Sequence, residues 1–196
     1  MPQIVDYPIV AQRLTAPPVG QGLISLYHNS GAFGFAPGVA VHTFGWMGPL
    51  DPTIREEMRP RVRQVGEPYH QSLARLLVRA WQTHLPGEVW LMPKSHWHYE
   101  LHFGNRELLQ KLLPEIGVDP RQMADRNDGS AIAFAAGDGE IFERAARSLV
   151  EGLRFSDFLL AFPGRAALCT IHHHEQLWWQ VADDDDALAA ALESVK

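Results

Sequence analysis

Apolar residues recur with the period of an α-helix in four stretches of the chain. The longest covers residues 68–85, where Leu73, Leu77 and Trp81 share one face and Pro86-Gly87 follows the last turn. Comparable stripes predict helices over residues 105–113, 140–152 and 184–195. The acidic run Asp183–Asp186 fits the start of the last helix, because negative side chains are favoured at the positive end of the helix dipole.

Short apolar or alternating runs predict the strands. They cover residues 22–28, 38–46, 88–92, 94–103, 130–136, 156–162 and 166–180. Proline and glycine predict an irregular lead-in over the first twenty residues, with a short strand at residues 3–7, and a loop at residues 29–37. Asp51-Pro52 resembles an N-cap followed by proline, which predicts a short helix that ends near Pro60.

The order of these elements predicts an α+β protein with two tandem βαββα-like halves, a mainly antiparallel sheet, helices covering one face and a cleft between the halves. The halves are residues 1–117 and 130–196, joined by a linker or packed into one compact domain. Laying Pro93 on Pro163 aligns Leu101 with Ile171. This order of elements is similar to that of duplicated ligand-binding modules of the gyrase-inhibitor-like type. The similarity involves no motif residues and implies a cleft for a small ligand.

Residues 94–103 carry the sharpest division between polar and apolar positions. Successive side chains of a strand point to opposite faces, so the two kinds of residue would separate completely. The core face would carry Trp97, Tyr99, Leu101 and Phe103. The opposite face would carry Lys94, His96, His98, Glu100 and His102. Three imidazoles and a carboxylate on one face point to a metal, a ligand, a partner or solvent.

A second histidine cluster, His172-His173-His174, lies within the segment 166–180. In a continuous strand His172 and His174 share a face with Gln176, and His173 points away. Two histidines two residues apart can chelate one ion, and neighbouring strands would supply the remaining ligands. The candidate metal ligands are His96, His98, His102, His172 and His174.

These ligands suit Zn²⁺ or another divalent transition metal. With three protein ligands, a bound water could act as the nucleophile and Glu100 as the general base of a metal-assisted hydrolysis, whereas four ligands would make the site structural. The same histidines can instead form a solvated face, a partner surface or an interface that weakens when the imidazoles become charged below about pH 6.5. The sequence therefore does not require a cofactor.

Composition narrows the range of partners. The chain has 196 residues, 46% of them hydrophobic, and a formal net charge of −6 with no basic run. We therefore expect neither nucleic acid nor an anionic membrane as a partner. The single cysteine, Cys169, cannot form an internal disulfide, and no apolar segment is long enough for a membrane span, which favours a cytoplasmic protein. The sequence carries none of the common hydrolase, nucleotide or dinucleotide motifs.

Two tryptophans complete the candidate surface. Trp46 lies in a predicted turn, and Trp178 and Trp179 put their side chains on opposite faces of a strand, so Trp46 and Trp178 are the expected ligand or partner contacts. The sequence thus predicts a soluble cytoplasmic protein that binds a small molecule or a protein partner on a sheet face rich in histidine and tryptophan. The alternative is a divalent-metal-dependent enzyme, a hydrolase, with a histidine-lined site and Glu100 as its catalytic residue.

Overall fold

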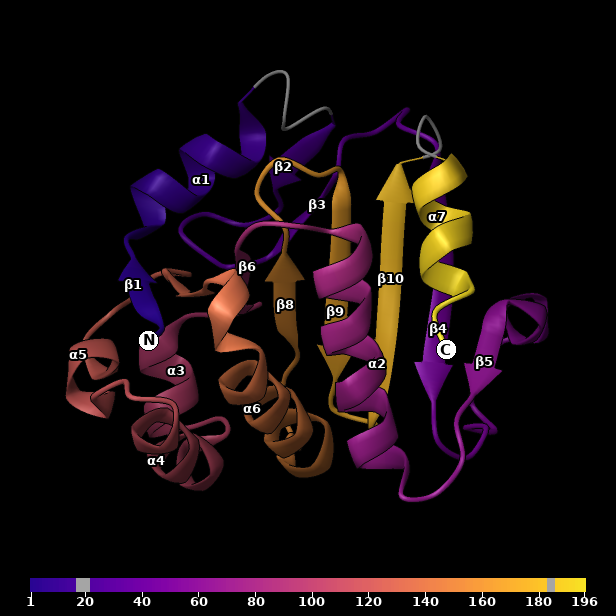
Figure 1. The fold of residues 1–196 in the computed structure, drawn as a ribbon. Coiled ribbons are helices and arrows are strands. Elements are labelled where there is room, and N and C mark those ends of the chain that lie inside the picture. The colour runs from indigo at the N-terminus through magenta and orange to yellow at the C-terminus, as the bar shows by residue number, and fades with distance from the viewer. Residues whose placement is uncertain (17–21, 183–185) are drawn as a thin grey trace.

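A computed structural model describes residues 1–16, 22–182 and 186–196 of the chain. Its main sheet has eight strands in the order β1-β7-β6-β8-β9-β10-β4-β5 (Figure 1). These strands are β1 (Gln3–Val5), β4 (Val41–Met47), β5 (Val62–Gln64), β6 (Val89–Pro93), β7 (Ala131–Phe134), β8 (Phe158–Ala161), β9 (Ala167–His172) and β10 (Gln176–Ala182). A separate hairpin pairs β2 (Leu23–Ser25) with β3 (Phe33–Phe35). The neighbouring strands of the main sheet are antiparallel except for the parallel pair β4–β5.

Seven α-helices and two 3₁₀-helices are present in the described part of the chain. The α-helices are α1 (Tyr7–Thr15), α2 (Tyr69–His84), α3 (Trp97–His102), α4 (Arg106–Glu115), α5 (Pro120–Ala124), α6 (Gly139–Gly152) and α7 (Asp186–Glu193). The 3₁₀-helices are η1 (Glu56–Arg61) and η2 (Ala136–Asp138). None of the described helices has the length and apolar character needed to cross a lipid bilayer. The predicted α+β fold with a mainly antiparallel sheet is confirmed, as are the helices at α2, α4 and α6.

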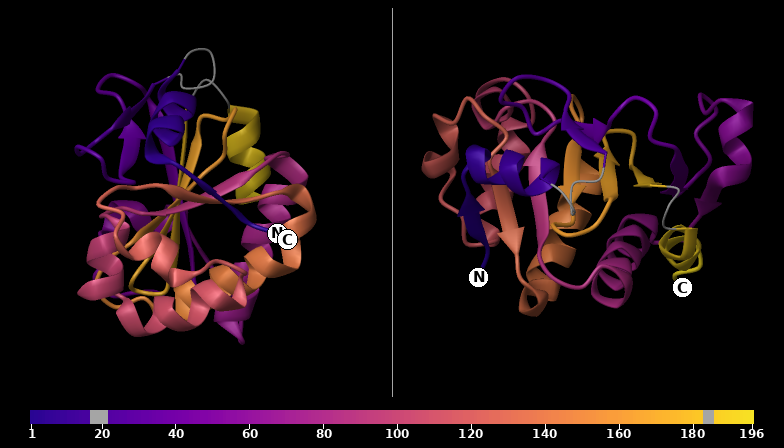
Figure 2. Two further views of the ribbon diagram at one scale, coloured as in Figure 1. Left: turned by 90° about the vertical axis from the view of Figure 1, so that its left-hand side faces the viewer. Right: turned by 90° about the horizontal axis from the view of Figure 1, so that it is seen from above.

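Different elements cover the two faces of the main sheet (Figure 2). Helices α2, α3, α4, α6 and α7 contribute to one large buried cluster, which fills the face seen in front in Figure 1. Helix α1 and the β2–β3 hairpin pack on the other face, where Val10 and Phe33 meet Trp90 and Leu159. The expectation that helices cover only one face is therefore wrong for α1.

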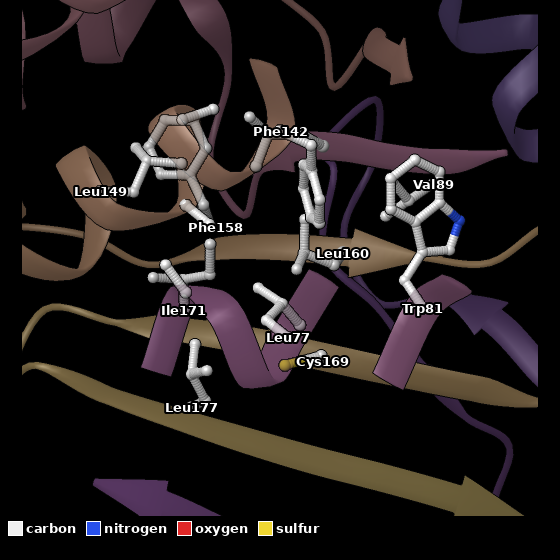
Figure 3. Packing of buried hydrophobic residues seen from close by; sticks show 14 of the residues in the cluster. Leu77, Trp81, Val89, Phe142, Leu149, Phe158, Leu160, Cys169, Ile171 and Leu177 are labelled. Atoms are coloured by element: carbon white, nitrogen blue, oxygen red, sulfur yellow. The ribbon is translucent and has the colours of Figure 1, made fainter. Parts of the chain in front are cut away.

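The larger core lies between α2, α6 and the middle strands (Figure 3). Trp81 of α2 meets Phe142 of α6 edge to face, with ring centroids 5.2 Å apart, and the indole Nε1 of Trp81 donates to the Gly87 carbonyl at 3.1 Å. Cys169 of β9 lies below Leu77 and is fully buried. Burial raises the pKa of the Cys169 thiol well above its usual value, and a buried, protonated thiol is unreactive.

Several segments differ from the prediction. Residues 7–15, expected to be irregular, form α1, whose buried Val10 and Leu14 are four positions apart, as on one face of a helix. The predicted linker 117–129 contains α5 and buries Met123, so it belongs to the core. The predicted loop 29–37 contains β3. The strand predicted over residues 166–180 is the β9–β10 hairpin, and Asp183 to Asp185 lie outside the described residues.

The predicted strand at residues 94–103 is wrong, because residues 97–102 form helix α3. Trp97 and Leu101 are buried, as expected, but Tyr99 is 46% exposed and Phe103 is 72% exposed. Residues four apart share a face both in a helix and in a strand, so the Trp97–Leu101 spacing does not distinguish the two structures. The helical period instead brings Glu100 to the buried side.

Helix α3 is fixed by bonds to the segment that precedes β7. The N–H groups of Trp97 and His98 donate to the carbonyls of Asp128 and Arg126 at 3.2 and 2.9 Å. The indole Nε1 of Trp97 donates to the Ser130 carbonyl at 2.6 Å. The carbonyls of Asp128 and Arg126 thus satisfy two of the N–H groups that the first turn of any helix leaves free.

The structure does not confirm tandem halves or a cleft between them. Helix α3 occupies the place that the alignment of Pro93 on Pro163 gave to a strand, so the equivalence of Leu101 with Ile171 is wrong. Strands of the two expected halves also alternate in one sheet, where β7 lies between β1 and β6.

Replacing Leu101 by alanine should lower the free energy of unfolding by about 2–5 kcal/mol, because a buried leucine leaves a cavity. Tyr99→Ala should lower it by about 0.5 kcal/mol or less, since this exposed ring contributes little to the core. Urea denaturation of both variants measures the two values. Large and similar losses at both positions would contradict the helix and favour the strand.

Candidate functional site

The β9–β10 turn gathers three histidines at one end of the main sheet. His172 ends β9 opposite Gln176, and residues 173–175 connect the two strands. The Glu175 N–H donates to the His172 carbonyl at 3.1 Å, and the φ of Glu175 is 63°, the left-handed conformation that completes a three-residue hairpin turn. His172, His173 and His174 are together termed the tri-histidine turn.

Two carboxylates from other parts of the chain hold the tri-histidine turn. His173 Nδ1 lies 2.8 Å from Oδ1 of Asp157, the residue before β8, and the same oxygen accepts from the His173 N–H at 3.2 Å. His174 Nδ1 lies 3.4 Å from Oδ2 of Asp51, in the segment after β4. Because a carboxylate only accepts, the neutral form of His173 that fits this contact has its proton on Nδ1 and the lone pair on Nε2.

Glu175 ties the turn to the start of α2. Its Oε2 accepts from the Tyr69 hydroxyl at 3.0 Å, and this bond raises the pKa of Tyr69. His70 Nε2 lies 3.2 Å from the same oxygen but lacks the alignment of a hydrogen bond. The turn is thus anchored by three separate segments.

The three imidazoles of the turn lie against one another. Ring centroids are 4.4 Å apart for His172–His173 and for His173–His174, and 4.9 Å apart for His172–His174. One ring nitrogen from each of the three residues lies within 4.8 Å of the others, so that in the described part of the chain these residues form a group that could hold a metal ion. The side chains are 28%, 30% and 52% exposed, so solvent reaches all three.

The surroundings of His172 favour its neutral form. Burial lowers the pKa of His172, Asp157 opposes this effect, and His173 and Lys94 add to it. Its Nδ1 accepts from the His174 N–H at 3.2 Å, so the neutral ring carries its proton on Nε2. A metal ion at Nδ1 would have to replace this hydrogen bond.

The face of β10 beside the turn carries an ordered polar chain. Trp178 Nε1 donates to Gln176 Oε1 at 2.7 Å, and Gln176 Nε2 donates to Asp51 Oδ2 at 2.9 Å. The other Asp51 oxygen accepts from the side chain and N–H of Thr53, bonds that lower the pKa of Asp51. The indole of Trp178 is therefore held in one orientation by its N–H.

Trp178 lies over a glycine and forms one wall of a pocket. A Cβ on Gly45, its neighbour on β4, would come within 2.9 Å of the indole ring, so the ring needs glycine there. The open pocket has a volume of about 430 Å³. Its lining includes His172, His174, Gln176, Trp178, Asp51, Thr53, Ile54, Arg55 and Met58.

The predicted ligands His96, His98 and His102 belong to a different part of the fold. They lie at and within α3, where His98 stacks near His102 with ring centroids 4.4 Å apart and His98 Nδ1 lies 3.0 Å from the Ala124 carbonyl. None of the three joins the metal-capable group formed by described residues. The structure thus brings together His172 and His174, and adds His173.

Trp46 and Glu100 are buried away from the candidate surface. Trp46 is fully buried in the core and packs on Trp179, with ring centroids 5.3 Å apart. Glu100 is also fully buried, and its carboxylate accepts from Ser95, Ser156 and Asn105. Among the described residues, no histidine side chain is a partner of the Glu100 carboxylate, which links α3 to neighbouring segments.

Sequence reasoning missed His173, Asp157 and Asp51. The polar run His172–Glu175 between two apolar stretches is typical of a hairpin turn, and this pattern would have placed His173 beside its neighbours. Asp51 could not be found in this way, because Asp51 and Gln176 are 125 residues apart and meet only in the folded chain.

Glu100→Gln should lower the free energy of unfolding by about 1–3 kcal/mol, because an amide NH₂ cannot accept and leaves a buried donor without its acceptor. Chemical denaturation at neutral pH measures this loss. Glu107→Gln is the matched control, since Glu107 is exposed on α4 and should change the stability little. Equal stability of both variants and the parent chain would contradict the structural role of Glu100.

The chain was also compared with known proteins. The comparisons with protein-family models, with curated proteins and with solved structures found no match.

Proposed function

We propose that this chain is a binding protein whose ligand is a divalent transition-metal ion, held by the tri-histidine turn. The observation that supports this best is the approach of three imidazole nitrogens to within 4.8 Å of one another. In a tetrahedral zinc site with Zn–N bonds of about 2.0–2.1 Å, the nitrogens are separated by about 3.4 Å. Rotation of three partly exposed rings on a turn can close that difference.

The surroundings of the turn support a metal ligand at His173 most strongly. Asp157 accepts from Nδ1 and leaves Nε2 available, which is the usual arrangement of a carboxylate behind a metal-binding histidine. The neutral state of His172 also favours metal binding, because only an unprotonated imidazole nitrogen can coordinate. Lys94 opposes metal binding, since its Nζ lies 3.9 Å from Asp157 Oδ2 and adds a positive charge near the site.

Three protein ligands leave a coordination position for water or for a bound molecule. His172 and His174 also line the Trp178 pocket, so a molecule in that pocket could reach this position. A metal ion at this site could also assist a hydrolysis, and Glu100 would not be the general base of that reaction.

Zn²⁺ should bind metal-free protein with a stoichiometry of one, as measured by titration calorimetry at pH 7.5. His173→Ala should remove most of this affinity, and Asp157→Asn should weaken it about 10–100-fold, the range for a group that orients a metal ligand. Affinity should fall on acidification, because protons compete for the imidazole nitrogens.

The matched control is the double variant His98→Ala/His102→Ala, which removes the other pair of neighbouring imidazoles. It should bind Zn²⁺ as the parent chain does. Binding that survives the loss of His173, or that disappears in the control variant, would contradict the proposed site.

A second candidate function is metal-free binding of a small molecule or partner on the same face. The observation that favours it is the Trp178–Gln176–Asp51 chain, which keeps a half-buried indole ring in one orientation beside a 430 Å³ pocket. A fixed aromatic ring with its N–H already bonded offers a flat surface for stacking.

A further inference from the structure

A second pocket is flanked by two exposed phenylalanines. Phe103 follows α3 and is 72% exposed, and Phe155 precedes β8 and is 71% exposed. Both line a pocket of about 540 Å³, whose lining also includes residues of α4 and the end of α6. Two large apolar side chains left in water at one pocket are typical of a binding site, whereas a single exposed one needs no explanation.

The backbone that carries Phe155 is fixed by partly buried hydrogen bonds. The N–H of Arg154, on one side of it, donates to Asn105 Oδ1 at 3.0 Å. Ser156, on the other side, accepts from Asn105 Nδ2 at 2.9 Å and donates to Glu100 at 2.7 Å. The phenyl ring is thus presented by an ordered segment, which lowers the entropy cost of binding.

The same network reaches the segment that carries Phe103. The N–H and side-chain amide of Asn105 donate to Glu100 Oε2 at 3.3 and 2.9 Å. A Cβ on Gly104 would approach this oxygen to 2.5 Å, so the chain between Phe103 and Asn105 passes close to the carboxylate. One buried carboxylate therefore organises both aromatic walls of the pocket.

The rim of the pocket is positively charged on a chain whose net charge is −6. Arg106, Lys111 and Arg154 line it, and Glu107 is the acidic residue of the lining. Arg106 and Lys111 make no ion pair with any residue that the structure describes. These cations are free to meet an anion from solution.

We infer that this pocket binds a small organic anion that carries an aromatic ring. The ring would contact Phe103 and Phe155, and a carboxylate, phosphate or sulfonate group would face Arg106 and Lys111. The volume falls within the range of about 300–1,000 Å³ that is usual for small-molecule sites. This inference is independent of the metal proposal, because the two pockets share no lining residue.

The test uses two fluorescent probes with nearly the same aromatic body. The folded chain is titrated with 8-anilinonaphthalene-1-sulfonate and, separately, with uncharged N-phenyl-1-naphthylamine. The anionic probe should bind saturably at one site and more tightly than the neutral one, and added salt should weaken only the anionic probe, since it screens exposed charges.

Variants then locate the binding. Phe103→Ser and Phe155→Ser should each weaken binding of the anionic probe by about tenfold, through loss of an aromatic contact. Arg106→Glu/Lys111→Glu should weaken the anionic probe several-fold and leave the neutral probe unchanged. Tyr27→Ser and Arg165→Glu are the controls, since they remove an exposed aromatic ring and an exposed cation elsewhere on the surface.

Far-ultraviolet circular dichroism of each variant shows that it is folded, so that probe binding to an unfolded chain is not counted. Equal binding of the two probes, or anionic binding that is unchanged by both phenylalanine variants, would overturn the inference. So would a loss of binding in the Tyr27 or Arg165 control.

Discussion

The architecture depends on the unequal cover of the main sheet. Over β6, β8 and the neighbouring part of β9, both faces are buried, by the α2–α6 layer on one side and by α1 with the β2–β3 hairpin on the other. Toward β10 and β4 neither α1 nor the β2–β3 hairpin contributes to the buried cluster of described residues on this face, and Thr43, Thr170, Trp178 and Gln180 are only half-buried. The α2 side of the same strands, with Phe44 and Trp179, is fully enclosed. Strands β10 and β4 thus have one buried face and one face that is partly exposed to solvent.

The partly exposed face of β10 and β4 accommodates polar side chains, and the tri-histidine turn lies at the end of this face. A buried imidazole or carboxylate would have required a partner for every polar atom. At a half-exposed turn, solvent meets part of that demand, and Asp157 and Asp51 meet the rest. The structure therefore holds three imidazoles together while solvent and two carboxylates serve as partners for their polar atoms.

Glu100 is the opposite case, a carboxylate removed from water. Burial of an ionised group is costly unless it is fully hydrogen-bonded, and here hydroxyl and amide donors from three segments converge on it. The same bonds join α3, the start of α4 and the segment before β8. The pocket lined by Phe103 and Phe155 depends on this junction. Phe103 comes shortly before Asn105 and Phe155 directly before Ser156, and the side chains of Asn105 and Ser156 both donate to Glu100.

The sequence by itself determined the elements whose pattern allows one interpretation. The stripes of α2 and α6 fit a helix alone, and the Trp178-Trp179 pair had to divide between two faces, as it does. The pattern of residues 97–102 does not decide between a helix and a strand, because the Trp97–Leu101 spacing fits the periods of both. The helix is selected by the carbonyls of residues 126–130 and by the donors around Glu100. The partners of the histidines were likewise decided by tertiary structure, since strand pairing brings to the turn both Asp157, which is 16 residues from His173, and Asp51, which is 125 residues from Gln176. Local periodicity acts over a few residues, whereas a hydrogen bond between distant segments exists only after the sheet has set their separation.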